Sequence, residues 1–334
     1  MSAIRVLISE TFDPWFNLAT EDYIFREMNP DHHILFLWRN DNTVVIGRYQ
    51  NPWAECNIKN MEKDHVKLAR RQSGGGAVYH DLGNTNFTFL SSRNSYSKER
   101  NTDIIVQALK NLHIDAEASG RNDIVVDGKK ISGSAFKLGS DRAFHHGTLL
   151  IDADLSKISN YLTPDKQKLQ SKGIKSVKSR VANLIDFNPK INHASVCSAV
   201  IEEFFHAYDA ACEPEILDHE QLKTIPHLQN YFDKMSDWNW RFGKTPDFEH
   251  HMTERFDWGR MEVFIDTKSG RINSIRIYSD CLAPDMIEQI MTDLKYVPYC
   301  AQAVEKALND TMEKLPQRRE NLEEFSRWII SQLD

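Results

Sequence analysis

The sequence predicts an α+β fold, because its strand-like and helix-like segments are segregated along the chain instead of alternating as βαβ units. Of its 334 residues, 41% are hydrophobic and 27% charged, which is the composition of a globular protein with a sizeable core. The character of the chain changes near residue 240, where residues 237–246 read as a connection. We therefore expect a large first part and a smaller second part.

Charge and cysteine content exclude several classes of protein. The 41 basic and 48 acidic residues leave a net charge of −7, so a nucleic-acid partner and a whole-surface basic face are not expected. No apolar run approaches the ~20 residues of a membrane helix, and Glu10 and Asp13 interrupt the N-terminus before a signal peptide could form. The cysteines are scattered and form no CxxC pair, which predicts reduced thiols in a cytoplasmic protein without a zinc site.

The first part of the chain opens with a helix. Asp13-Pro14 is an N-cap followed by a first-turn proline, and Phe16, Ala19 and Tyr23 recur at roughly helical spacing. Further helices are expected at residues 103–112 and 196–212. Apolar or alternating segments predict strands at residues 34–38, 43–46, 66–70, 86–90, 124–126, 130–132 and 146–151.

Two turns and the second part complete the expected organisation. The turn at residues 40–42 should join two buried strands, and Asp127-Gly128 is a hairpin-turn dipeptide. After residue 248 we expect a strand pair at residues 261–265 and 272–278, followed by two or three amphipathic helices from Pro284 onward.

Glycine is concentrated where a ligand could approach the backbone. Nine of the fourteen glycines lie between Gly74 and Gly147, and three of them are consecutive in the stretch Arg70–Asp81. Such a triplet exposes N–H groups that can hold a phosphate beside an arginine, although a plain flexible loop is about as common. Neither a P-loop nor a G-x-G-x-x-G motif occurs in the chain.

Each of the other clusters also has an ordinary structural interpretation. Lys129-Lys130 follows the Asp-Gly turn and would ordinarily be a solvated hairpin tip, but the small residues after it allow a pocket-facing cation. In His145-His146 adjacent strand residues point to opposite faces, so a metal site is disfavoured. The pairs His32-His33 and His250-His251 read as surface turns, and the cationic stretch 166–180 is either a solvated face or a docking patch.

Taken together and in this order, these segments resemble the bacterial lipoate–protein ligase A family over almost the whole chain. The similarity is carried by residues 13–19, 35–40, 44–48, 70–81, 120–123, 130–135 and 145–149. The arginine–triglycine loop and the lysine before Ile-Ser-Gly are specific to the lipoate and biotin ligase superfamily when they occur together.

The resemblance implies a biotin/lipoate ligase-like catalytic domain with a mixed, mainly antiparallel sheet at residues 1–247 (core about 29–216), and an accessory domain at 248–334. It implies a two-step reaction, in which lipoate, and also octanoate, reacts with ATP and Mg²⁺ to give lipoyl-AMP and pyrophosphate. The lipoyl group then passes to a lysine of lipoyl domains in 2-oxo acid dehydrogenase complexes or of the glycine cleavage H protein. We also expect a monomer.

Residue by residue, the resemblance assigns roles to positions of this chain. It implies that Lys130 is the catalytic lysine and contacts both ATP and lipoate. The other implied ATP contacts are Arg71, Gly76, Ala77, Val78 and Tyr79. The other implied lipoate contacts are Ser73, Gly74, Gly75, His80 and His146, and adenylate contacts are implied for Asn122 and Asp123.

Three rival functions remain on the same fold. An ATP-independent octanoyl or lipoyl transferase would use a cysteine nucleophile, yet no cysteine lies in the motif segments. Biotin ligation is disfavoured, because the loop resembles the lipoate branch of the superfamily. A non-catalytic lipoate-binding relative stays open.

Overall fold

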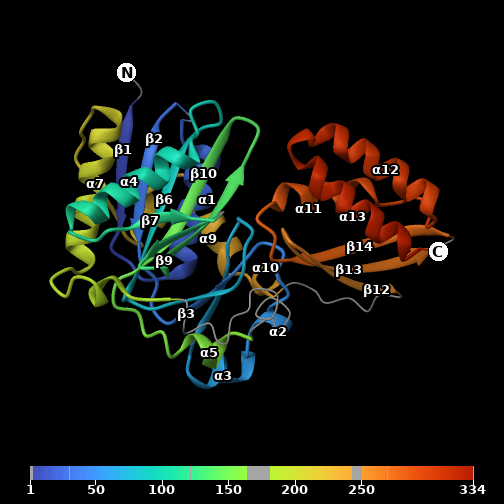
Figure 1. Cartoon of the computed structure of the whole chain (residues 1–334), viewed down its shortest axis with the longest axis horizontal. Helices are drawn as coiled ribbons and strands as arrows, with labels where there is room; N and C mark the ends of the chain where they lie inside the picture. Colours follow the sequence, from blue (N-terminus) through green and yellow to red (C-terminus); the bar gives the residue numbers. More distant parts are fainter. Residues whose placement is uncertain are drawn as a thin grey trace. The chain divides into compact units, whose positions relative to one another are not determined.

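The computed structural model describes residues 3–29, 31–120, 122–163, 181–242, 250–268 and 270–333. Contacts divide the chain into two units (Figure 1). Unit 1 comprises residues 1–46, 52–72 and 77–242, and unit 2 comprises residues 47–51, 73–76 and 243–334. The expected boundary at 247/248 and the cationic stretch 166–180 lie outside the described residues, so both stay predictions.

Unit 1 contains an eight-stranded mixed sheet in the order β11-β1-β2-β6-β10-β9-β8-β7. Strand β1 pairs in parallel with β11 and β2, and the other pairs are antiparallel, which confirms the expected fold class. The strands are β1 (Ile4–Ser9), β2 (His33–Trp38), β6 (Asn84–Ser92), β7 (Glu117–Ser119), β8 (Asp123–Val126), β9 (Lys129–Leu138), β10 (Arg142–Leu150) and β11 (Glu215–Leu217).

Helices cover both faces of this sheet (Figure 1). Helices α4 (Lys98–Asn111) and α7 (His193–Tyr208) share a core with Leu35 and Leu37, whereas α1 (Pro14–Glu27) and α9 (Leu228–Ser236) share the other core with Ile34 and Phe36. Successive side chains of a strand point to opposite faces, so β2 is buried on both sides. This double burial explains why residues 34–38 form an uninterrupted apolar run.

A second sheet of unit 1 has the order β4-β3-β5, with β3 (Thr43–Ile46), β4 (Lys67–Arg70) and β5 (Val78–His80). The strands at 34–38 and 43–46 are therefore not paired, because residues 39–42 carry the chain from one sheet to the other. The remaining short helices of unit 1 are α2 (Pro52–Glu55), α3 (Ile58–Lys63), α5 (Ile158–Tyr161), η2 (Leu184–Asp186), α8 (Gln221–Thr224) and α10 (Trp238–Arg241).

The expected hairpin between β8 and β9 is confirmed. Asp127 and Gly128 both have positive φ angles, of 51° and 73°, as a two-residue type I′ turn requires. Just after this turn, the N–H of Ala182 donates to the carbonyl of Lys130 at 3.0 Å. The backbone of Lys130 is thus held on both sides.

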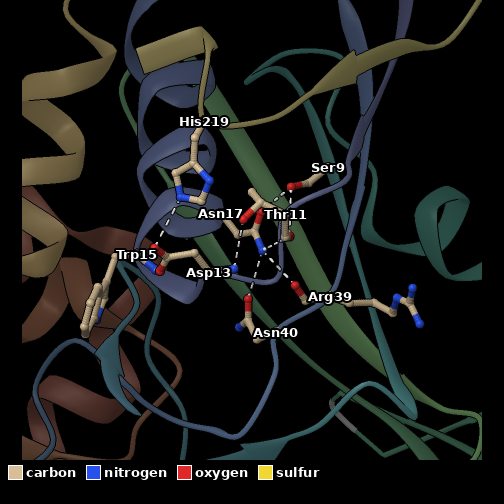
Figure 2. Close-up of polar contacts among 8 residues, drawn as sticks. All are labelled: Ser9, Thr11, Asp13, Trp15, Asn17, Arg39, Asn40 and His219. Carbon is tan, nitrogen blue, oxygen red and sulfur yellow. Dashed lines mark hydrogen bonds and ion pairs between the residues drawn. The ribbon is translucent and has the colours of Figure 1, made fainter. Parts of the chain in front are cut away.

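Helix α1 is tied to the sheet by buried amides (Figure 2). Asp13 caps it by accepting from the N–H of Trp15 at 3.0 Å, as its sequence predicts. One turn further, the fully buried side chain of Asn17 donates through Nδ2 to the carbonyl of Arg39 at 2.8 Å, and its Oδ1 accepts from the Ser9 hydroxyl at 2.6 Å. These bonds fix α1 against β1 and the end of β2.

Unit 2 is an antiparallel sheet, with a core shared by three helices. The strands are β12 (His250–Phe256), β13 (Gly259–Lys268) and β14 (Arg271–Ser279), and the helices are α11 (Pro284–Asp293), α12 (Ala301–Lys314), the short η3 (Pro316–Arg318) and α13 (Arg319–Ser331). The predicted strand pair and helices are confirmed. The surface-turn interpretation of His250-His251 is wrong, because these residues begin β12, where the His251 ring stacks on Phe264 at 4.3 Å.

The surface-turn interpretation also fails at His33, which is buried at the start of β2 and stacks on Tyr208 at 4.2 Å. The helix predicted at 196–212 runs from 193 to 208, since Asn192 caps its start and Asp209 ends it in a left-handed conformation. No helix of the described ranges is long and apolar enough to cross a membrane.

Two short segments from the first quarter of the chain are part of unit 2. The carbonyl of Tyr49 accepts from the N–H of Ser279 at 2.8 Å, and Tyr49 belongs to the core of this unit. The N–H of Gly75 donates to the carbonyl of Cys281 at 3.1 Å. The triglycine loop is consequently held by the residues that follow β14.

Candidate functional site

Lys130 of β9 lies beside a carboxylate and a glycine. Its ammonium is 2.7 Å from Asp123 Oδ1 at the start of β8, and a side chain at Gly133 would come within 2.7 Å of the same nitrogen. Asp123 pairs with Gly133 across the β8–β9 ladder, so the sheet register brings the three residues together. The result is a partly exposed cation held at a defined point, as expected of a residue that must meet an anionic substrate.

A buried chain of hydrogen bonds runs from His146 towards Trp38. His146 Nδ1 lies 2.7 Å from Glu21 Oε1, which also accepts from the Thr88 hydroxyl at 2.7 Å. Trp38 Nε1 donates to the Thr88 oxygen at 3.1 Å. Alternation along β10 places His146 on the sheet face covered by α1, so this strand residue meets the carboxylate of that helix.

Arg71 and Arg70 differ in their surroundings. The Arg71 guanidinium is buried and donates to the carbonyl of Val45 at 3.1 Å. Burial lowers its pKa to about 10, opposed by the negative charge of Glu21. Arg70 instead donates to the carbonyl of Arg241 at 2.8 Å, which ties β4 to α10.

His80, at the end of β5, is 3% exposed and contacts the Asn40 amide nitrogen through Nδ1 at 3.2 Å. Its pKa is lowered to about 3, chiefly by burial and to a smaller extent by the charges of Arg71 and His146. His80 is therefore neutral at physiological pH. Arg71 lies close enough to Glu21 and to His80 for their charges to interact, and His80 likewise interacts with His146.

Asn122 and Tyr79 direct their side chains to structural partners. Asn122 donates to the carbonyl of Ser134 at 3.0 Å, and its own carbonyl accepts from the N–H of Ser134 at 2.8 Å. The Tyr79 hydroxyl donates to the side chain of Asn42 at 3.1 Å, and its ring packs near Tyr161. The expected contacts of these two residues with nucleotide stay predictions.

The structure distributes the predicted loop residues between the two units. Ser73, Gly74, Gly75 and Gly76 belong to unit 2, whereas Ala77 and Val78 belong to unit 1 with the remaining predicted site residues. Gly75 has a φ angle of 92°, a conformation that favours glycine, and its N–H is already donated to Cys281.

Four residues beside the predicted ones were missed by sequence reasoning: Glu21, Trp38, Asn40 and Thr88. One signal was available for Glu21, because helical spacing places Asn17, Glu21 and the apolar Ile24 on one face of the helix predicted after Asp13. The structure shows that all three are buried. Polar residues on the buried side of a helix need buried partners. The partners themselves are distant in sequence and carry no local signal.

No group of three or more histidine, cysteine, aspartate or glutamate side chains among the described residues could hold a metal ion. One Cys–His contact occurs in α7, where Cys197 Sγ lies 3.6 Å from His193 Nδ1. Burial raises the pKa of the Cys197 thiol to about 12 and lowers that of His193 to about 4. This pair is therefore not a thiolate–imidazolium nucleophile.

Family models match both parts of the chain. Residues 13–205 match the lipoyl protein ligase A/B catalytic domain, and residues 245–329 match the bacterial lipoate protein ligase C-terminus. The chain is 50% identical to the lipoate-protein ligase A of Psychrobacter cryohalolentis, over 99% of each protein.

Solved structures of lipoate protein ligases also superpose on this chain. LipL1 of P. falciparum in complex with lipoate superposes with a TM-score of 0.87 at 36% identity, over 98% of this chain and all of that one. A bipartite lipoate protein ligase described with its E2 lipoyl domain, from Thermoplasma acidophilum, gives 0.64 at 28% identity, over 75% of this chain and all of that one. A lipoate-protein ligase A bound with ATP gives 0.63 at 28% identity, over 73% of this chain and 99% of that one. With both of its parts matched and a relative at 50% identity over its length, this chain belongs to the lipoate–protein ligase family of enzymes.

Proposed function

We propose that the enzyme activates lipoate with ATP to lipoyl-AMP, releasing pyrophosphate, and then transfers the lipoyl group to a lysine of an acceptor lipoyl domain. Relatives provide support for each substrate: one was solved with lipoate, one with ATP, and one is described with an E2 lipoyl domain. The observation in this chain that carries the proposal is the placement of Lys130 against Asp123 and Gly133.

The first step brings two anions together, since a carboxylate attacks the α-phosphate of ATP. Lys130 would touch the lipoate carboxyl and the α-phosphate, orient the attack and offset the charge that develops in the transition state. Asp123, at 2.7 Å, holds the ammonium before substrate arrives. Arg71 would add a second cation for the nucleotide, together with the backbone of residues 76–79.

The dithiolane and its alkyl chain need a slot with apolar walls and few polar groups. We infer that the buried aromatic side chains of His146 and Trp38, which are linked by hydrogen bonds through Glu21 and Thr88, form one wall of this slot. We assign His80, His146 and residues 73–75 to the lipoate side of the site, and Asn122 and Asp123 to the adenylate.

Magnesium fits this proposal as a partner of the nucleotide and not as a resident ion. Asp123 is the carboxylate that stands beside Lys130, and Mg²⁺ prefers phosphate oxygens and water with one or two carboxylates. When bound with ATP, the ion would neutralise phosphate charge. We also keep as proposals the use of octanoate, transfer to the glycine cleavage H protein, a cytoplasmic location and a monomeric state.

The test is to incubate the protein with ATP, Mg²⁺ and lipoate, octanoate or biotin, and to weigh an acceptor lipoyl domain by mass spectrometry while measuring pyrophosphate. We expect ATP-dependent addition of one lipoyl or octanoyl group, with stoichiometric pyrophosphate and no reaction with biotin. Acyl transfer from a preformed acyl donor without ATP would instead indicate a transferase. Binding of lipoate without any product would indicate a non-catalytic relative.

A further inference from the structure

Two asparagine side chains, Asn17 of α1 and Asn40 after β2, are fully buried in series beside His80. Figure 2 shows Asn17 at the centre of this arrangement, with Ser9, Thr11, Arg39 and Asn40 around its amide. We refer to Ser9, Asn17 and Asn40 as the amide relay.

Backbone carbonyls decide the orientation of the first amide. Asn17 Nδ2 lies 2.8 Å from the carbonyl oxygen of Arg39 and 3.2 Å from that of Thr11, and such oxygens can only accept. The opposite atom, Asn17 Oδ1, receives the Ser9 hydroxyl at 2.6 Å. Exchanging the nitrogen and oxygen would place an acceptor against two acceptors, so this orientation is the one the network allows.

The orientation of the Asn17 amide determines the orientation of the Asn40 amide and the tautomer of His80. Asn17 Nδ2 donates to Asn40 across 3.0 Å, so the Asn40 atom that faces it is the oxygen. Asn40 therefore turns its NH₂ group towards His80 Nδ1, at 3.2 Å. An amide nitrogen has no lone pair to offer, so Nδ1 must be the acceptor and cannot carry a proton.

We propose that the amide relay locks neutral His80 in the tautomer with its proton on Nε2, so that this nitrogen offers a hydrogen bond to an oxygen of the acyl substrate. The inference rests on the proposed function for the identity of that oxygen, which would belong to the carboxylate or to the acyl group of the adenylate. His80 acts as a substrate-binding donor, and Asn40 and Asn17 are positioning residues.

Two observations support a ligand acceptor for this donor. His80 Nε2 is buried and has no hydrogen-bond partner among the residues that the structure describes, which is a costly state for an N–H group. The charges of Arg71 and His146 act on the same ring, so His80 lies near the residues that we assign to the anionic substrate. The low pKa of His80, about 3, keeps the second proton away and preserves a single tautomer.

Nitrogen NMR of the unmodified protein tests the relay directly. In ¹⁵N-histidine-labelled enzyme, the His80 signals can be assigned by their loss in His80→Gln. We expect a protonated Nε2 and an unprotonated Nδ1 at pH 7 without substrate. A proton on Nδ1, or a mixture of tautomers, would overturn the proposal.

The variant Asn40→Asp replaces the donor that faces Nδ1 with an acceptor of nearly the same shape. We expect the proton to move to Nδ1, and the KM for lipoate in pyrophosphate release to rise roughly 10- to 100-fold, as for the loss of a hydrogen bond to a charged group. Because the lost hydrogen bond is to the acyl substrate, the KM for ATP should stay within about twofold of the wild-type value. An unchanged KM for lipoate would refute the role of the tautomer in binding.

A double-mutant cycle separates tautomer control from simple packing. Alanine at position 80 leaves no ring whose tautomer Asn40 could set, so in His80→Ala the additional change Asn40→Asp should have little further effect on KM. A full additional penalty would mean that Asn40 is structural. If the wild-type enzyme makes no adenylate, the proposed function fails, whereas the NMR result still decides the relay.

Discussion

Lys130 and Lys129 are neighbours in β9 whose surroundings differ, and this difference allows a sharp test of the catalytic residue. Lys130 is partly buried and paired with Asp123, whereas Lys129 is exposed. We expect Lys130→Ala to lower the rate of lipoyl-AMP formation roughly 100- to 1000-fold, as for loss of an electrostatic donor in a transition state. Lys130→Arg should rescue poorly, because a planar fork does not replace a compact ammonium.

Lys129→Ala is the matched control and should keep nearly the full rate, measured as pyrophosphate release in the presence of lipoate. Near-normal adenylation by Lys130→Ala would show that Lys130 is a solvated hairpin lysine.

His145 is a buried histidine whose burial makes the folded protein less stable at acidic pH. Its ring is almost fully buried among Phe87, Phe89 and Phe136, and neither ring nitrogen has a partner among the described residues. Burial lowers its pKa from 6.5 to about 3, with smaller effects from the charges of His146 and Lys98. The unfolded chain therefore binds a proton below pH 6.5 that the folded chain refuses until about pH 3.

Stability must consequently fall as the pH decreases from 6.5 towards 3, by about 1 kcal/mol from this residue between pH 7 and 5.5. Urea unfolding at the two pH values measures this difference. His145→Leu should reduce the acid sensitivity by that amount, while adenylation at pH 7 stays unchanged. An equal loss of stability in both proteins would assign the acid sensitivity to other groups.

At the scale of single elements, strand β9 has a glycine, Gly133, where any side chain would collide with the end of Lys130. A Cβ at Gly133 would lie 2.7 Å from Lys130 Nζ and 2.9 Å from Lys130 Cε, which is the flexible end of a side chain. Gly133→Ala should therefore leave the unfolding temperature nearly unchanged and displace the ammonium from Asp123. We expect a fall of at least about tenfold in the rate of adenylation, since an error of 1 Å in positioning can cost roughly 100-fold.

Gly133→Ala in a Lys130→Ala background should not lower the rate of adenylation further, because the lysine atoms that it would displace are absent. A fall of equal size in both backgrounds would show that Gly133 serves the strand and not the lysine.

Two consecutive arginines at the end of β4 are expected to have different roles, Arg70 in stability and Arg71 in nucleotide binding. Arg71→Ala should raise the dissociation constant for ATP, because it removes a cation that we assign to the nucleotide. Gly75→Val should also weaken nucleotide binding, because the φ angle of 92° at this position strains a branched residue and the strain would displace the adjoining backbone of residues 76–79, which we assign to the nucleotide. Isothermal titration with ATP measures both variants.

Arg70→Ala is the control for this loop, because it loses the carbonyl of Arg241 and should lower thermal stability without changing ATP affinity. Wild-type ATP affinity in folded Arg71→Ala and Gly75→Val would contradict the assignment of the loop.

At the scale of the whole molecule, charge must permit docking of the acceptor. The enzyme carries a net charge of −7, and lipoyl domains that are themselves acidic would be repelled at long range. The sequence places six cations between Lys166 and Arg180, and we expect this stretch to attract the acceptor. Reversing three of these charges should slow lipoyl transfer more than adenylation.

The deficit should grow at low ionic strength, where electrostatic attraction contributes most to association. Comparing transfer and pyrophosphate release at two salt concentrations measures it. Equal losses in both steps would assign the stretch to ATP instead.

Local sequence determined the α+β class, the doubly buried strand at residues 34–38, the Asp127-Gly128 hairpin and the family. These features depend on neighbours within a few residues: strand alternation, turn chemistry and caps act over one turn or one strand. The lysine before Ile-Ser-Gly belongs here too, since the hairpin itself brings Asp123, Lys130 and Gly133 together.

Tertiary structure alone decided which buried polar groups meet. Glu21 and His146 are 125 positions apart, and Asn40 and His80 are 40 apart, so no local pattern encodes their contacts. It also joined the triglycine loop to the carbonyl of Cys281 and sent the strands at 34–38 and 43–46 into different sheets. The physical reason is that a buried polar group must find a partner wherever the packed chain supplies one, and only the packing brings such distant residues within hydrogen-bond distance.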